Sequence, residues 1–579
     1  MLRHVGSWFF LGILTLLAFP VDSLAEGKPA AAKPNIILIT LDSTRADRMG
    51  FMGSHSGVTP SLDGIARQGI VFAQAYAQAP GTVVSSATIL TGTYPQIHRA
   101  SEFGVPLSPT LPYLPDLLHA SGYHTAAFVG SILLDPRSGP FQGYDRGFDV
   151  FDAGFHLAQR GESRFQSVER HGDQVVAHAV KWLTGNKQRP FFLWMHLQDA
   201  CAPYATSYDH GVGAADAAVG KLTAFLRSQS LYDDALIVVS SSHGESLGTH
   251  GEDTHGIFLY DETIHVPLVL KLPKNLMAGK QIKNRARLLD IAPAVLAEAG
   301  IPVPAQMQGQ SLMRIAQASS QADQPAYSRS ELPQQGFGCS VLESWRAGKY
   351  LYIRAPKPEL YDLSVDPAVS HNLALSAKAT LETIASQLQA LDSRLGNESG
   401  NSTGSGLTSS EMQKLASLGY VGLQKSSTGV NAASEGTDPK DAIVAVNKTL
   451  AAVLELDDGK PEKAIPALRQ VLAAQPNFYL AQYGMGAALV QQQQYAEAIA
   501  YLHEAIELQP DSAMAHYEMG VSLMKTGDFK TAAVHLEIAS GRMLGFSALH
   551  STLAEVYERL GRTPDAARER ARASQEKNN

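Results

Sequence analysis

The strongest constraint on the fold is a 34-residue spacing in the last quarter of the chain. Small residues recur at this interval in three columns across four copies, and Pro476 and Pro510 keep the same interval. Small residues let two helices pack closely, a proline ends the second helix, and a single unit of this kind cannot bury its apolar face alone. The spacing therefore predicts an all-α solenoid of four 34-residue units over residues 441–579. The columns are Ala452, Gly486, Gly520 and Ala554; Ala464, Ala498, Ala532 and Ala566; and Val471, Ala505, Ala539 and Ala573.

A different pattern precedes the repeats. From residue 33 to 395, short apolar runs alternate with helical segments. The runs at 35–41, 125–129, 191–195 and 236–240 are typical of buried strands, and 61–67 and 220–227 of helices. This alternation predicts an α/β domain with a mostly parallel sheet, whose ligand site lies beyond the carboxyl ends of the strands.

The two remaining segments differ in composition from both domains. Residues 1–25 have a basic start, a short apolar run and a small-x-small site, which predicts a signal peptide and a periplasmic or secreted protein; an uncleaved anchor is the alternative. Residues 396–440 are rich in Gly, Ser, Thr and Asn, which predicts a linker, with one short docking helix at 409–418. We expect no membrane span after signal cleavage, and the formal net charge of -8 argues against a nucleic-acid partner.

Polar side chains follow the predicted strands where a ligand site is expected. Asp42 comes directly after a buried run, so its carboxylate either binds a metal or cation or caps a helix. Thr82 follows a glycine at a predicted helix start, so its hydroxyl either attacks a sulfuryl or phosphoryl centre or caps the helix. His243 and His255 lie in a loop rich in histidine and glycine, where imidazoles bind zinc or manganese, act as acid or base, or merely pack.

Five runs in these segments resemble the sulfatase family, and they follow one another in the order expected for it. The resemblance covers residues 33–425, and it implies the fold of the alkaline-phosphatase superfamily. The later units resemble the tetratricopeptide repeat (TPR), which follows the sulfatase domain in one bacterial branch of the family. The five runs are 42–47, 89–95, 243–256, 260–267 and 358–367.

The resemblance implies a chemistry and assigns residues to it. In this family a divalent metal (Ca, Mn or Zn) binds a sulfuric or phosphoric ester, and an activated nucleophile attacks it. By position, Asp42 and His243 correspond to metal ligands, Thr82 to the nucleophile, and His255 to a substrate-contacting lysine or histidine.

Several positions depart from the family pattern. True sulfatases make a formylglycine from the cysteine of a Cys-x-Pro-x-Arg motif; Thr82 stands at that cysteine, so no formylglycine forms. Ser242 stands where the family has an aspartate ligand, and Cys201 where it has a histidine. A site with one carboxylate fewer should hold a hard cation weakly.

Two hypotheses remain open from the sequence. The first is a sulfatase-family hydrolase with a degenerate site and weak or lost catalysis. The second is a pseudoenzyme scaffold that binds a protein or peptide partner through the array, and a sulfated or phosphorylated ligand is a further candidate. Tyr483 and Tyr517, with Gln491 and Lys525, occupy equivalent repeat positions and are expected on the concave docking face.

The two cysteines leave three alternatives. Cys201 and Cys339 either form a disulfide across the cleft, or stay free thiols, or Cys201 is a soft metal ligand beside Asp199 and His255. Sequence spacing alone cannot place their Cα atoms within bonding range.

Overall fold

A computed structural model describes residues 33–101, 107–136, 143–154, 170–187, 190–201, 207–318, 323–398, 436–543 and 546–578. Residues 34–579 gather into one compact unit. The signal peptide predicted over 1–25 and the docking helix predicted over 409–418 lie outside the described residues. Across the described ranges, every helix is too short or too polar to cross a bilayer.

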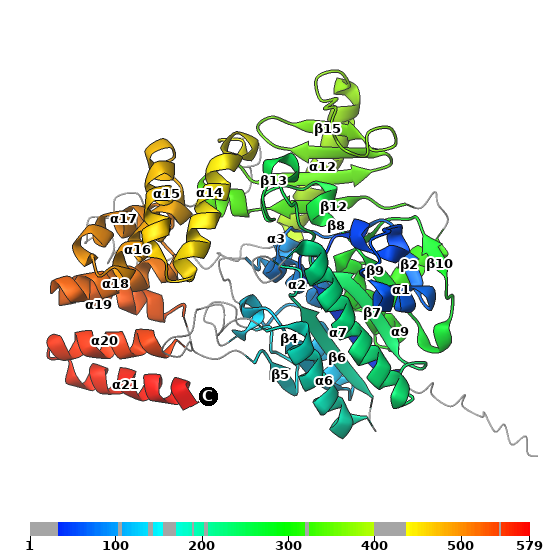
Figure 1. Ribbon diagram of the computed structural model, residues 1–579, viewed down its shortest axis with the longest axis horizontal. Helices are drawn as coiled ribbons and strands as arrows, with labels where there is room; N and C mark the ends of the chain where they lie inside the picture. The colour runs from blue at the N-terminus through cyan, green and yellow to red at the C-terminus, as the bar shows by residue number, and fades with distance from the viewer. Residues whose placement is uncertain are drawn as a thin grey trace, which may run out of the picture. The chain divides into compact units, whose positions relative to one another are not determined.

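An eight-stranded sheet with the strand order β10-β2-β9-β7-β1-β6-β4-β5 forms the first domain's centre (Figure 1). Strand β1 runs parallel to both β6 and β7, and β4 runs parallel to β5 and β6; β9 is antiparallel to β2 and β7. The predicted mostly parallel α/β sheet is thus confirmed, and the four predicted strands are β1, β4, β6 and β7. The strands are β1 (Ile36–Leu41), β2 (Ile70–Phe72), β4 (His124–Val129), β5 (Val150–Asp152), β6 (Phe191–Leu197), β7 (Leu236–Ser241), β9 (Leu268–Lys271) and β10 (Lys280–Ile282).

Alternate residues of the central strands enter two separate cores, one on each face of the sheet. In β1, Ile36 and Leu38 belong to one core, and Ile37 and Ile39 to the other. Helices α2 (Thr82–Thr91), α4 (Leu114–Ala120) and α9 (Ile291–Glu298) supply the first core. Helices α1 (Pro60–Arg67), α6 (Gly172–Asn186) and α7 (Tyr208–Ser228) supply the second, and α1 and α7 contain the two helices predicted from the sequence. Burial on both faces explains why the strands are continuously apolar.

Two smaller sheets complete this domain. Strands β3 (Ala75–Tyr76), β8 (His265–Val266) and β11 (Ala286–Arg287) form one. Strands β12 (Ala326–Ser330), β13 (Leu342–Ala347), β14 (Tyr350–Arg354) and β15 (Glu359–Asp362) form an antiparallel one. Helix α12 (Lys378–Glu398) packs against it and extends past residue 395, where the linker was expected to begin, because Leu395 is buried in the same apolar cluster. Short helices include α3 (Pro95–His98), α8 (Asp261–Ile264), α10 (Leu312–Gln317) and α11 (Leu332–Phe337).

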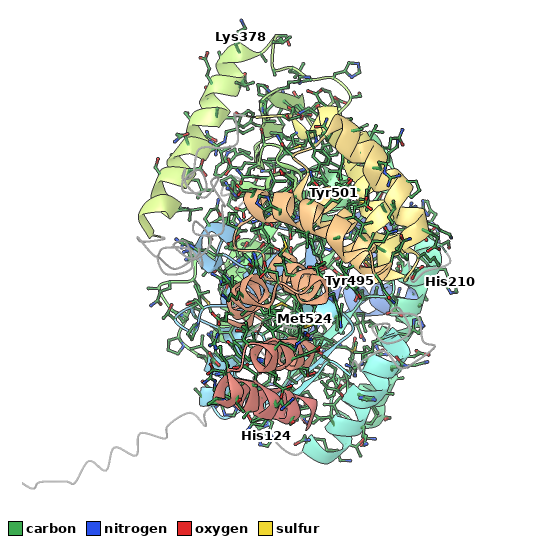
Figure 2. All side chains as sticks on the ribbon, turned by 90° about the vertical axis from the view of Figure 1, so that its left-hand side faces the viewer. His124, His210, Lys378, Tyr495, Tyr501 and Met524 are labelled. Carbon is green, nitrogen blue, oxygen red and sulfur yellow. The ribbon has the colours of Figure 1, made fainter. Side chains whose placement is uncertain are left out.

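The C-terminal part is an array of helix pairs, as the 34-residue spacing predicts (Figure 2 shows Tyr501 on α17 and Met524 on α18). The repeated alanines at 464, 498 and 532 are completely buried. A Cβ on Gly486 would lie 2.6 Å from Leu502, so this column does bring helices into close contact. The helices are α14 (Pro439–Asp457), α15 (Pro461–Ala474), α16 (Tyr479–Gln491), α17 (Tyr495–Leu508), α18 (Ala513–Thr526), α19 (Phe529–Ser540), α20 (Ser547–Arg559) and α21 (Thr563–Asn578).

Candidate active site

Asp42 lies at the carboxyl end of β1, the central strand of the sheet, and is 1% exposed. Its backbone N–H donates to Leu197 O of β6 at 2.7 Å, which fixes the turn at the strand end. A buried carboxylate needs polar partners. The polar neighbours of Asp42 are Thr82, Ser242, His196 and His243. The sequence predicts this side chain beyond the carboxyl end of the strand, and it lies there in the structure.

Thr82 is the first residue of helix α2 and is 4% exposed. Its hydroxyl Oγ1 lies 3.0 Å from Asp42 Oδ1 and 2.9 Å from Oδ2, and it donates to the carboxylate. Gly81 precedes it with an extended backbone, so Thr82 begins the helix and does not cap it. The helix-cap interpretation of Thr82 is therefore wrong, and its hydroxyl lies within the polar cluster.

His243 follows β7 and is completely buried. Its Nδ1 lies 2.8 Å from the carbonyl oxygen of Gly244, which can only accept, so Nδ1 carries a proton. Its Nε2 lies 3.3 Å from Thr82 Oγ1 and 3.2 Å from Asp42 Oδ1. The structure thus brings together Asp42, Thr82 and His243, which the sequence predicted to share one site.

His196 is a member of this cluster that the sequence interpretation missed. Trp194 Nε1 donates to Thr40 Oγ1 at 2.9 Å, and Thr40 Oγ1 lies 2.9 Å from His196 Nδ1. His196 Nε2 lies 3.8 Å from Asp42 Oδ2. A histidine inside the apolar run 191–197 was the available signal, but only the register of β6 against β1 places it beside Asp42.

The two histidines set the charge state of the carboxylate. Burial would by itself raise the pKa of Asp42, but hydrogen bonds and positive charge from His196 and His243 hold that pKa well below its usual value. Asp42 is therefore an anion, and it accepts hydrogen bonds from Thr82 and Ser242.

His255 is held by Glu245 and not by Asp42. Its Nδ1 lies 3.0 Å from Glu245 Oε2, and its ring lies 4.2 Å from the His243 ring, centre to centre. Burial would lower the pKa of His255, but the charge and hydrogen bond of Glu245 raise that pKa to about 9. His255 is thus a cation at neutral pH. Glu245 is 2% exposed. It lies inside the run 243–256, which carries the family resemblance, but the sequence pattern does not identify it as a site residue.

The two positions that depart from the family pattern border the same carboxylate. Ser242 Oγ donates to Asp42 Oδ1 at 2.5 Å. Burial raises the pKa of the Cys201 thiol to about 12, so it is a neutral thiol. Cys201 and Cys339 are not joined to each other by a disulfide, so the disulfide alternative is wrong for this structure. The backbone of Cys339 forms an isolated β-bridge with Thr437.

These donors do not fit the hard divalent cation that the family implies. Such a cation requires several oxygen ligands with available lone pairs. In this cluster, Asp42 supplies the carboxylate that contacts Thr82 and His243. The hydroxyls of Thr82 and Ser242 both donate their protons to this carboxylate. Among the described residues, no three His, Cys, Asp or Glu side chains are placed to hold one ion, so Cys201, Asp199 and His255 do not form a metal site either.

The repeat positions predicted to dock a peptide are partly engaged within the array. Tyr483 stacks on Tyr479 at 6.1 Å, and Tyr517 meets Phe546 edge-on at 5.2 Å. Gln491 Nε2 donates to Leu456 O in α14. Tyr517 and Gln491 contact residues outside their own helices, whereas Tyr483 stacks within α16. The peptide-docking role of these positions stays a prediction.

Comparisons with known families follow these structural boundaries. Residues 34–301 match the model described as Sulfatase, and residues 251–395 match the C-terminal region of N-sulphoglucosamine sulphohydrolase. Residues 449–513 and 483–539 match a tetratricopeptide repeat.

Similar proteins and structures point to the same fold. Arylsulfatase K of Rattus norvegicus is 23% identical over 65% of this chain and 81% of its own length. The multifunctional alkaline phosphatase superfamily protein PehA of Trinickia caryophylli is 24% identical over 59% of this chain and 91% of its own. Among solved structures, a phosphonate monoester hydrolase of Agrobacterium radiobacter has a TM-score of 0.53 at 19% identity, over 63% of this chain and 96% of that one. At this identity the structural likeness shows the fold alone.

Proposed function

The chain belongs to the sulfatase family through its first domain, and we propose from this premise that its ester-hydrolysing site is degenerate. Its catalysis is weak or lost, and the site binds a ligand instead of hydrolysing it. The single observation that supports this proposal is the closed hydrogen-bond set around Asp42. Thr82 and Ser242 donate to its carboxylate, and His196 and His243 hold its pKa well below the usual value. A carboxylate with so low a pKa is a weak base, so it accepts the proton of the Thr82 hydroxyl poorly and does little to activate that hydroxyl for attack.

The array gives this binding protein a second surface. Tetratricopeptide arrays present extended concave faces, so a protein or peptide partner is the natural ligand there. An exported, periplasmic location is part of the proposal and rests on residues 1–25 of the sequence.

A residual hydrolase is the second candidate, and one observation favours it. In neutral His243 the lone pair is on Nε2, 3.3 Å from Thr82 Oγ1. Thr82 would transfer its proton to His243 as its oxygen bonds to phosphorus or sulfur, and cationic His255 would protonate the leaving alcohol. This step requires Thr82 to release Asp42 first.

The deciding experiment measures metal content and turnover on the full mature protein. Elemental analysis should find less than stoichiometric Ca, Mn or Zn, and aryl sulfate and aryl phosphate should turn over no faster with wild type than with Thr82→Val. A stoichiometric metal with Thr82-dependent turnover would overturn the proposal.

Restoring the family's side chains sharpens this test. Ser242→Asp with Cys201→His should raise metal affinity by more than the sum of the two single changes, because both positions border Asp42. Additive or absent effects would show that the two positions do not share one metal pocket.

A further inference from the structure

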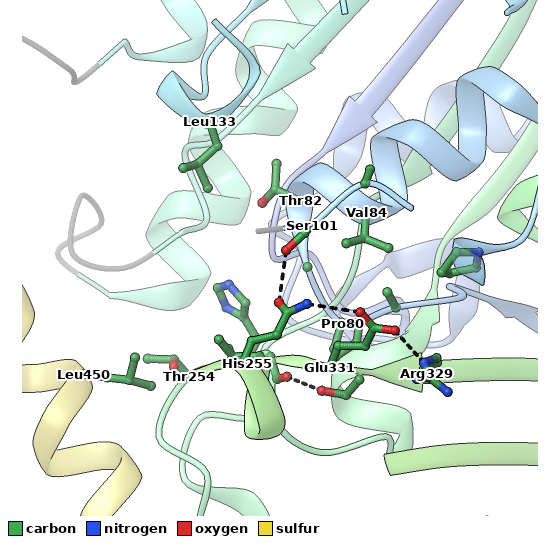
Figure 3. Close-up of a pocket in the computed structure, with 18 of the residues that line it drawn as sticks. Pro80, Thr82, Val84, Ser101, Leu133, Thr254, His255, Arg329, Glu331 and Leu450 are labelled. Carbon is green, nitrogen blue, oxygen red and sulfur yellow. Dashed lines mark hydrogen bonds and ion pairs between the residues drawn. The ribbon is translucent and has the colours of Figure 1, made fainter. Parts of the chain in front are cut away.

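A pocket opens beside the polar cluster, and the repeat array supplies one of its walls. The cavity has a volume of about 300 Å³ and is lined by Thr82, Glu245 and His255 on the cluster side. Helix α14 contributes Leu450, which Figure 3 shows, together with Val453 and Leu454, and no sequence pattern predicts these contributions. The other apolar residues that line it are Ala79, Pro80, Val84, Pro95, Ala100, Leu133 and Leu332. A pocket of this size and apolar lining is suited to a small molecule.

Helix α14 is fixed to the loop that carries His255. Asn447 Nδ2 donates to Gly251 O at 2.7 Å, and its Oδ1 accepts from Asp253 N at 3.4 Å. Lys440 at the start of the helix pairs with the buried carboxylate of Glu359 at 2.7 Å. These contacts join α14 to the His255 loop and to strand β15, so the helix that forms the pocket wall is also fixed to the His255 loop.

The charged groups of the pocket are balanced within it, with one exception. Arg329 pairs with Glu331 at 2.7 Å, and Gln335 bridges Ser101 and Glu331. His255 Nδ1 forms a hydrogen bond with Glu245 Oε2. The other carboxylate oxygen, Glu245 Oε1, is buried and has no hydrogen-bond partner among the described residues. A buried carboxylate oxygen is a strong hydrogen-bond acceptor, so Glu245 Oε1 is suited to accept from a donor group on a bound molecule. Because His255 already pairs with Glu245 Oε2, a single neutral donor such as a hydroxyl is enough to complete the partners of this carboxylate.

We infer that this pocket binds an apolar alcohol, with a phenol or fused aryl ring as its body, whose hydroxyl donates to Glu245 and whose ring packs against Leu450, Val453 and Leu454 of the array. The inference rests on the proposed function, because it concerns a ligand that is held and not hydrolysed. In this binding mode, helix α14 is both the first helix of the array and a determinant of ligand specificity. A sugar sulfate fits this lining poorly because its hydroxyls and anion would lose water without gaining partners.

Two matched probes test the ligand chemistry on the full mature chain. Titration with 2-naphthol, followed by its fluorescence, should show saturable binding, and 2-methoxynaphthalene, which lacks the donor, should bind about tenfold more weakly. Glu245→Gln should abolish this preference for the hydroxyl compound. Equal affinity for both probes in wild type, or tighter binding of glucose 6-sulfate, overturns the inference.

Two matched variants test the wall supplied by the array. Leu454 and Leu508 have the same exposed fraction, 38%, and each lies near the end of an array helix, but Leu454 alone lines the pocket. Leu454→Gln should weaken 2-naphthol binding by about fivefold or more, and Leu508→Gln should leave it unchanged. Equal affinities in two variants with wild-type circular dichroism overturn the role of α14. A stoichiometric metal with Thr82-dependent turnover of an aryl sulfate would instead refute the proposed function, whatever 2-naphthol does, so the two failures can be told apart.

Discussion

The floor of the pocket and the array that forms its wall are stabilised in opposite ways. The floor, the polar cluster around Asp42, is buried, and its central carboxylate accepts hydrogen bonds from Thr82 and Ser242. The core of the array is apolar, and it depends on small residues such as Gly486 and Ala498 that let helices approach. Hydrogen bonds and charge therefore stabilise the floor, whereas close packing stabilises the wall. Changes to the two regions should therefore have different signatures.

The largest effect is expected at the floor. Asp42→Ala removes the shared acceptor of Thr82 and Ser242 and the buried carboxylate that lies beside His196 and His243. Breaking a buried charge set in this way typically lowers the free energy of unfolding by about 3–5 kcal/mol. Urea unfolding followed by tryptophan fluorescence measures it, because Trp194 is linked to the cluster through Thr40.

Asp47→Asn is the control for that variant. Asp47 also pairs with a cation, Arg45, but its side chain is 56% exposed. An exposed pair contributes about 0–1 kcal/mol. If both variants lose the same free energy of unfolding, the Asp42 cluster is not the stabilising unit described here.

The next effect tests close packing in the array. A Cβ on Gly486 would lie 2.6 Å from Leu502 Cγ, which Leu502 cannot fully avoid in the buried interface. Gly486→Ala should therefore lower the free energy of unfolding by about 1–3 kcal/mol through overpacking. Thermal unfolding followed by circular dichroism measures this loss.

Gly484 provides a matched control on the same helix. A Cβ there would meet Leu468 at 3.4 Å, an ordinary contact, so Gly484→Ala should be neutral or slightly stabilising. If the two alanine variants behave alike, the 34-residue column does not mark the close helix contacts.

These two regions also differ in how far the sequence predicts them. Asp42 and His243 meet because the parallel strands β1 and β7 end at one edge of the sheet, which the apolar runs already indicate, and Thr82 joins them from the start of α2. His196 could not be selected, because its contact with Asp42 depends on the register between β6 and β1. The repeat period predicts the array, but Leu454 lines the pocket only through tertiary contacts of α14 such as that of Asn447. Local sequence patterns thus predict the helices, the strands and the residues at strand ends. They do not predict which residues become neighbours through tertiary side-chain contacts.

A polar pair inside the array makes it sensitive to acid. His516 Nε2 lies 2.9 Å from Pro510 O, which only accepts, so the Nδ1 of His516 is the acceptor for His535 Nδ1–H at 2.8 Å. Burial, with the nearby His516 and His503, holds the pKa of His535 well below its usual 6.5. A base whose folded pKa is depressed binds fewer protons in the folded array than in the unfolded chain. Stability is therefore lost as the pH falls below about 6.5, by up to about 1.4 kcal/mol per pH unit.

Hydrogen exchange of peptides from α18 and α19, corrected for the intrinsic effect of pH, measures this loss between pH 7 and pH 5. His535→Leu removes the titrating group and should reduce the pH dependence of the protection factors. An unchanged dependence in this variant would assign the acid sensitivity to other groups.

The smallest effect is expected where the array meets the first domain at the surface. Lys357 Nζ contacts Asp441 at 2.6 Å, with side chains 64% and 52% exposed, whereas Lys440 contacts Glu359 at the same interface with Glu359 only 5% exposed. Asp441→Asn should change the free energy of unfolding by less than about 1 kcal/mol, and 1 M NaCl should remove the difference because salt screens exposed charges. Glu359→Gln should cost more and resist salt, since Glu359 also accepts from the hydroxyls of Tyr260 and Tyr361. Denaturant titrations of both variants at 0.05 M and 1 M NaCl compare them directly. If Asp441→Asn is the more damaging change, the buried Lys440–Glu359 pair is not what holds α14 against the pocket.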